Sequence, residues 1–199
     1  MKKSILVPVF AIVLAAVILF AAAAGLEGIA VKNAQAEHLK IMQTLLPGSD
    51  AFTLEAYSGE DANIRSVHKS DKGFVVETVT YGYAGEITML IGVSTEGKVT
   101  GLVVRRMQET FGLGAQALTD HVFLSQFLNS AGTFEVAAAE DAFTGATGED
   151  TAAATGETVS VDAISGATVT SKAIIRSVNS AVSYVTGADT SSGATSWGG

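Results

Sequence analysis

The chain begins with an uninterrupted apolar stretch. Residues 4–24, SILVPVFAIVLAAVILFAAAA, contain no charged side chain. A helix of about 20 such residues, rising 1.5 Å per residue, is long enough to cross the hydrocarbon core of a bilayer. We therefore expect a cytoplasmic start over residues 1–4 and a transmembrane helix over residues 5–24. A cleaved signal peptide is the alternative, but its apolar core would run only roughly 7 to 15 residues, and the A-x-A-like site in NAQAE lies well beyond the apolar run.

Helical and strand patterns alternate after this stretch. Residues 27–46 carry apolar positions at helical spacing up to Pro47-Gly48, which predicts a juxtamembrane helix within residues 25–48. Runs rich in β-branched residues and bounded by glycine or charged turns then predict strands at 63–70, 73–82, 86–94 and 99–107. The TEGK sequence between the last two predicts a hairpin.

The second half of the domain is more helical. A helix is expected over 115–130, and another from Thr168, where an apolar stripe runs until Gly187 stops it. Residues 135–160 are rich in Ala, Gly, Thr and acids and predict an acidic surface insertion, and the small, polar residues 189–199 predict a flexible tail. Together the patterns predict one α+β domain over residues 49–188, with antiparallel strands packed against helices.

Charge restricts the partners and the orientation. Lys2 and Lys3 precede the apolar stretch and favour a cytoplasmic N-terminus, which puts the main domain on the extracytoplasmic side of the cell (inner) membrane. All 20 acidic residues, but only ten of the 12 basic ones, follow residue 24. A domain with this excess of negative charge repels nucleic acid and anionic lipid headgroups. The charge therefore argues against nucleic-acid binding.

The residues that usually carry chemistry are scarce. The chain has no cysteine, which excludes disulfides, cysteine-ligated iron–sulfur clusters and c-type haem. His38, His68 and His121 are scattered without metal-ligand spacing, so we expect no metal site. No G-x-S-x-G elbow supports a hydrolase. A loose G-x-G-x-x-A match at 112–117 lacks the βαβ context of a dinucleotide site.

One seven-residue pattern, D-x-x-[S/T]-G-A-T, occurs three times, at 141–147, 162–168 and 189–195. The plain interpretation of the second copy is a helix start, with Ser165 or Thr168 as N-cap and Asp162 near the positive end of the helix dipole. A helix start preceded by Gly-Ala also lets a phosphate reach backbone N–H groups. A threonine hydroxyl there could contact a phosphate or carry one.

The second copy resembles the flavinylation motif of the FMN-binding domain family, in which a flavin transferase joins FMN to the last threonine through a phosphoester bond. Residues 81–117 resemble the same family's glycine-turn hairpin and its E-T-P-G-L-G segment, with Phe111 where proline is usual. Within the family, the chain is most similar to G subunits of Rnf ion-translocating ferredoxin:NAD oxidoreductase complexes, relatives of the C subunit of sodium-translocating NADH:quinone oxidoreductase.

The resemblance implies roles for named residues. Thr168 would carry covalent FMN. The residues that would present it to the transferase and shape the phosphate site are Asp162, Ser165, Gly166 and Ala167, and those beside the flavin are Glu109, Thr110, Gly112, Leu113 and Gly114. We hypothesise that Thr147 and Thr195 are additional FMN sites.

The resemblance also implies a role for the whole chain. It would relay electrons among the other membrane and redox subunits of a complex, with no catalysis of its own. Two alternatives stay open: a stand-alone membrane-anchored flavoprotein that passes electrons to external acceptors, and a non-redox anchored binding module in which the motifs are only helix caps.

Overall fold

The computed structural model describes residues 3–109, 114–137 and 158–187. The chain divides into two compact units, Met1–Ile41 and Met42–Gly199. Helix α1 (Lys3–Leu45) is unbroken over 43 residues and ends just before Pro47. Large apolar side chains in its first half, such as Phe10, Ile12 and Leu19, are exposed. Across the described part of the chain, no helix combines the length and the apolar character that a membrane span requires.

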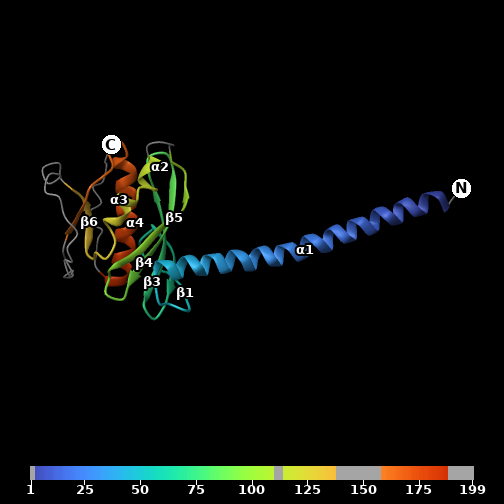
Figure 1. Ribbon diagram of the computed structural model, residues 1–199, viewed down its shortest axis with the longest axis horizontal. Helices are drawn as coiled ribbons and strands as arrows, with labels where there is room; N and C mark the ends of the chain where they lie inside the picture. The colour runs from blue at the N-terminus through green and yellow to red at the C-terminus, as the bar shows by residue number, and fades with distance from the viewer. Residues whose placement is uncertain (1–2, 110–113, 138–157, 188–199) are drawn as a thin grey trace. The chain divides into compact units, whose positions relative to one another are not determined.

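The second unit is an α+β domain built on a five-stranded antiparallel sheet in the order β1-β2-β3-β4-β5. The strands are β1 (Thr53–Glu55), β2 (Ile64–Lys69), β3 (Gly73–Tyr81), β4 (Glu86–Ser94) and β5 (Val99–Met107). Four of them confirm the predicted strands, and β1 was not predicted. The long helix α4 (Thr168–Thr186) lies along this sheet (Figure 1) and contacts β3 and β4.

Strand β4 is buried on both faces because the domain covers the sheet from two sides. On one side, Ile174, Val178 and other apolar residues of α4 pack against β4 in the main core. On the other side the end of α1 is seated on Gly92 and Gly101, which pair with each other across β4 and β5. A Cβ at Gly92 would overlap the carbonyl of Leu45, so only glycine permits this close approach.

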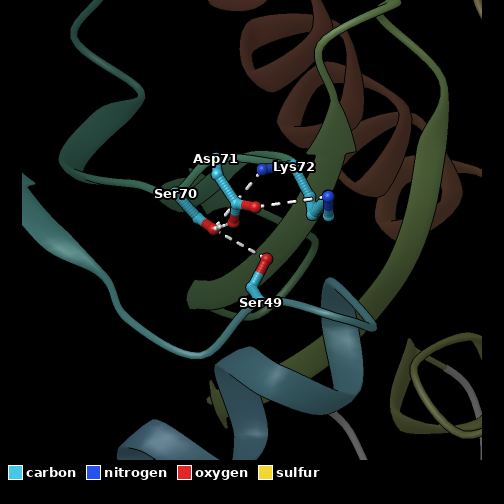
Figure 2. Close-up of polar contacts among 4 residues, drawn as sticks. All are labelled: Ser49, Ser70, Asp71 and Lys72. Atoms are coloured by element: carbon cyan, nitrogen blue, oxygen red, sulfur yellow. Dashed lines mark hydrogen bonds and ion pairs between the residues drawn. The ribbon is translucent and has the colours of Figure 1, made fainter.

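The segment that follows α1 is fastened to the β2–β3 turn by a small polar cluster (Figure 2). Ser70 Oγ lies 2.7 Å from Ser49 Oγ and 2.9 Å from Asp71 Oδ1. Lys72 Nζ lies 3.3 Å from the other carboxylate oxygen of Asp71. The hydrogen bond from Ser70, helped by Lys72, lowers the pKa of the Asp71 carboxyl. Ser49 and Ser70 are both buried, so their contact satisfies hydroxyls that water does not reach.

Two predicted segments differ from the observed elements. The single helix expected over 115–130 is two short helices, α2 (Gly114–Ala117) and α3 (His121–Ser125). The break occurs because Asp120 is extended and its carboxylate accepts hydrogen bonds from the N–H groups of Val122 and Phe123, which makes it the N-cap of α3.

The ends of the expected 135–160 insertion lie in strands. β6 (Thr133–Val136) and β7 (Thr158–Val161) pair in parallel as a separate two-stranded sheet. The side-chain amide of Asn179, in α4, bonds both backbone groups of Phe134 and so holds this small sheet against the helix.

Candidate functional site

Residues 162–167 form a loop between β7 and α4, and hydrogen bonds hold this loop in place. At its start, the backbone of Asp162 bonds the side-chain amide of Gln126, with a distance of 2.8 Å from Asp162 N to Gln126 Oε1. A turn then closes with the N–H of Ala167 on the carbonyl of Ile164 at 2.9 Å. Gly166 has φ of +80° there, a conformation that a side chain would strain.

The start of α4 lacks a side-chain cap. The N-cap residue is Ala167, so the predicted capping role of Ser165 or Thr168 is wrong. Ser165 and Gly166 are exposed at the tip of the turn, and the side chain of Asp162 is also exposed. The first N–H groups of a helix have no partner within the helix, and here no side chain at the N-cap supplies one.

Thr168 is the first residue of α4, and its side chain is exposed. Lys172 follows one turn later and is exposed as well, which brings a positive charge to the same side of the helix. An anion attached at Thr168 would therefore meet the positive end of the helix dipole and an ammonium group.

Glu109 follows β5 and lies between two glycines. A Cβ at Gly82 would overlap Glu109 Oε1, and a Cβ at Gly114 would overlap Glu109 Oε2. The carboxylate accepts one hydrogen bond, from the N–H of Ala84 at 3.3 Å. Its other oxygen, Oε1, is buried and has no partner in the described part of the chain. A buried carboxylate oxygen without a donor is unfavourable, and a donor group of a ligand would relieve that cost.

Thr170 lies two residues after Thr168 and also beside Gly114. Its side chain is fully buried in the first turn of α4, and its Oγ1 has no hydrogen-bond partner among the described residues. A Cβ at Gly114 would lie 2.7 Å from Thr170 Oγ1, on the same side where it would overlap Glu109. Gly114 therefore lies against Glu109 Oε2, which Ala84 N–H bonds, and against Thr170 Oγ1, which has no partner among the described residues.

The structure thus brings some of the predicted residues together. Glu109 and Gly114 lie beside the first turn of the helix that Thr168 begins. Thr110, Gly112 and Leu113 fall outside the described residues, as do Thr147 and Thr195. Thr170 and Gly82 were missed, because the partners that make them notable are distant in sequence. The only local signal was the position of Thr170, two residues after Thr168 on the predicted helix.

These features fit a phosphate-bearing flavin. The uncapped start of α4 and Lys172 suit a phosphate, and the two buried oxygens without described partners could be satisfied by the ring edge of FMN, which offers both donors and acceptors. Gly82 and Gly114 allow the Glu109 carboxylate to approach the backbone where a side chain would overlap it. Across the described residues, no cluster of His, Asp and Glu could hold a metal ion.

Comparison with known proteins agrees with this fit. The family model described as FMN-binding domain matches residues 82–183. The G subunit of the Na(+)-translocating ferredoxin:NAD(+) oxidoreductase complex from Acetobacterium woodii is 35% identical over 111 residues, covering 55% of this chain and 47% of the relative. The G subunit of an ion-translocating oxidoreductase complex from Methanosarcina acetivorans is 35% identical over 130 residues, covering 65% and 57%.

A third relative, from Clostridium ljungdahlii, is the G subunit of a proton-translocating ferredoxin:NAD(+) oxidoreductase complex and is 34% identical over 113 residues, covering 57% and 53%. The chain spans about half the length of the curated relatives it matches. Among solved structures, Shewanella oneidensis NqrC aligns over 73% of each chain with 19% identity and a TM-score of 0.42. The match over residues 82–183, which contains both motifs, means that this chain belongs to the FMN-binding domain family.

Proposed function

We propose that this protein is an electron-transfer subunit that carries FMN covalently, through a phosphoester bond to Thr168. The observation that carries the proposal is the exposed Thr168 at an uncapped helix start, whose first turn also holds Thr170, a buried hydroxyl without a partner among the described residues. In this chain without cysteine, a bound flavin supplies the redox chemistry.

The protein's own residues have three tasks in this proposal. The N–H groups of the first turn of α4, with Lys172, hold the phosphate by hydrogen bonds and charge. Glu109 Oε1 and Thr170 Oγ1, two buried oxygens without a partner among the described residues, would orient the ring by hydrogen bonds. Gly82 and Gly114 would keep Glu109 in its place, because any side chain there would overlap its carboxylate.

We propose further that the chain works in an Rnf-type complex, an ion-translocating ferredoxin:NAD oxidoreductase, with other membrane and redox subunits as partners. The names of the three relatives support this assignment. A flavin transferase would act during maturation. The uncharged residues 5–24 would anchor the chain in the cell membrane, with the N-terminus cytoplasmic and the domain on the outer side.

Intact mass spectrometry tests the flavin linkage. The full chain is expressed with and without a flavin transferase, as wild type and as Thr168→Ala, Thr147→Ala and Thr195→Ala. We expect wild type to gain the mass of one FMN less one water only with the transferase, and Thr168→Ala to lose that gain. The other two variants are matched controls, since each removes the last threonine of the same motif.

Two outcomes separate the alternatives. A second mass increment that disappears in Thr147→Ala or Thr195→Ala would establish an extra flavin site. An unmodified wild type, produced beside an active transferase, would refute the covalent linkage. Membership of a complex is tested separately: we expect the tagged protein, solubilised from its native membranes, to copurify with the other subunits, and its isolation alone would favour a stand-alone flavoprotein.

A further inference from the structure

A groove of about 450 Å³ runs between β5 and the segment that contains α3. Six consecutive residues of β5, 102–107, form one wall, and the opposite wall includes Leu118, His121 and Leu124. Residues of a strand point alternately to opposite faces of the sheet, so a wall of six consecutive residues means that the groove follows the edge of the strand. Strand β5 is the last strand of the five-stranded sheet.

Among the described residues, this edge has backbone partners only at its beginning. At the start of β5, the N–H and carbonyl of Val99 bond Ser130 and Asn129. Beyond Val99, no backbone group of another described segment bonds the outer side of β5. An open edge of this kind offers N–H and carbonyl groups to an added strand. At about 3.3 Å per residue, the six groove residues would match a strand of similar length.

Charge identifies the kind of strand that fits. Arg105 and Arg106 line the groove and are exposed, in a chain with a net charge of −8. In the described residues, the ion pairs join Lys72 to Asp71 and Lys98 to Glu96, and none involves these arginines.

A β-bulge lies at the two arginines. Thr88 pairs with Arg106 and Met89 pairs with Val104, so Arg105 is an extra residue without an opposite partner. A bulge of this kind redirects side chains relative to the regular alternation.

The remaining lining is apolar. Leu102, Val104 and Leu124 are partly buried and pack against the main core, and Leu118 is buried. They give the groove an apolar floor next to a cationic rim. A strand that alternates apolar and acidic residues would place one set on the floor and the other beside the arginines.

We propose that this groove binds an extended acidic segment of a partner protein, which adds to the sheet as a strand beside β5. A second copy of this chain fits less well, because pairing two β5 edges would bring two arginine pairs together. The inference does not depend on the proposed flavin linkage.

Peptide binding by the full-length protein tests the proposal. The probe is a fluorescent octapeptide of alternating Glu and Val, followed by fluorescence polarisation at low salt. The comparison peptides are one with Lys in place of Glu and one with alternate backbone nitrogens methylated, which removes one row of hydrogen-bond donors and keeps the charge. The methylated row is chosen to face β5.

The variants are Arg105→Glu with Arg106→Glu, and a control with Arg65→Glu and Lys69→Glu on β2, which has the same change in net charge. We expect the β5 variant to bind the acidic peptide at least tenfold more weakly and to prefer the lysine peptide. The control should stay within twofold of wild type, and methylation should weaken binding at least tenfold. Thermal melting checks that both double variants are folded.

Several results would overturn the proposal. If wild type does not bind the acidic peptide at millimolar concentration, the arginines only protect an exposed edge. Equal weakening in both double variants would show a response to net charge. Unchanged binding of the methylated peptide would exclude strand addition, and binding lost only in flavin-loaded protein would assign the groove to the flavin.

Discussion

Replacing Thr170 by valine should affect the flavin-free and the flavin-loaded protein in opposite directions. Valine has nearly the shape of threonine and removes the hydroxyl that has no partner in the fully buried site. Leaving a buried polar group unpaired costs about 1–3 kcal/mol. The free energy of unfolding of the flavin-free variant should therefore rise by about 1 kcal/mol. For a domain of this size, that corresponds to a rise in Tm of about 2–4 °C.

In the flavin-loaded protein, Thr170→Val should lower the stability instead. If Thr170 hydrogen-bonds the attached FMN, valine removes a bond worth about 0.5–1.5 kcal/mol and leaves a ligand atom unpaired. The stabilisation that loading gives should therefore be smaller in Thr170→Val than in wild type, by about 2 kcal/mol when both effects are counted.

Thr78→Val provides a matched control. Thr78 is also fully buried, and its Oγ1 also lacks a partner in the described residues, but it lies in β3 within the core. We expect Thr78→Val to raise the Tm equally with and without flavin. The assay is thermal melting of each variant expressed with and without the transferase. Equal shifts for Thr170→Val in both forms would mean that this hydroxyl does not contact the flavin.

Two further predictions concern stability. Gly92→Ala should lower the free energy of unfolding by about 2–4 kcal/mol in urea titration, because the new Cβ would overlap the Leu45 backbone and disturb the bond from Thr100 to that carbonyl; a change below about 0.5 kcal/mol would contradict this packing. Burial, and then the hydrogen bond to Glu55 at 3.1 Å, raise the pKa of Tyr184 above its usual value near 10. The stability that the raised pKa of Tyr184 contributes is complete below pH 10 and is lost as the pH rises through the raised pKa. Tyr184→Phe should therefore lose less stability above pH 10 than wild type. Parallel profiles of stability against pH would disprove this contribution of Tyr184.

The sheet was predictable because its signals are local. Alternation of side chains and the TEGK turn were enough to place β3, β4 and β5 within a residue or two. The end of α4 was equally clear, since Gly187 adopts the left-handed conformation that ends helices. These features depend on neighbours along the chain, which the sequence displays directly.

The missed features depend on contacts between distant segments. The β6–β7 pair joins strands separated by more than twenty residues, and nothing local encodes a parallel partner. The break at Asp120 was missed because the apolar spacing continued through it, although aspartate favours N-caps over helix interiors. At the candidate site, the resemblance proposed Thr168 and Glu109, whereas Thr170 became a candidate only when the structure placed it beside Gly114.

Hydrogen bonds hold the loop before Thr168 in one conformation, and a modifying enzyme would meet it in that conformation. Gln126 holds its beginning, and Ser171 Oγ accepts a hydrogen bond from Ile164 N at 3.2 Å, so folding has already ordered the segment before Thr168. A free peptide with the same seven residues would have to be ordered on binding, at about 1–2 kcal/mol per residue for the backbone alone. The folded domain should therefore be a far better substrate for flavin attachment than any short peptide copy of the motif.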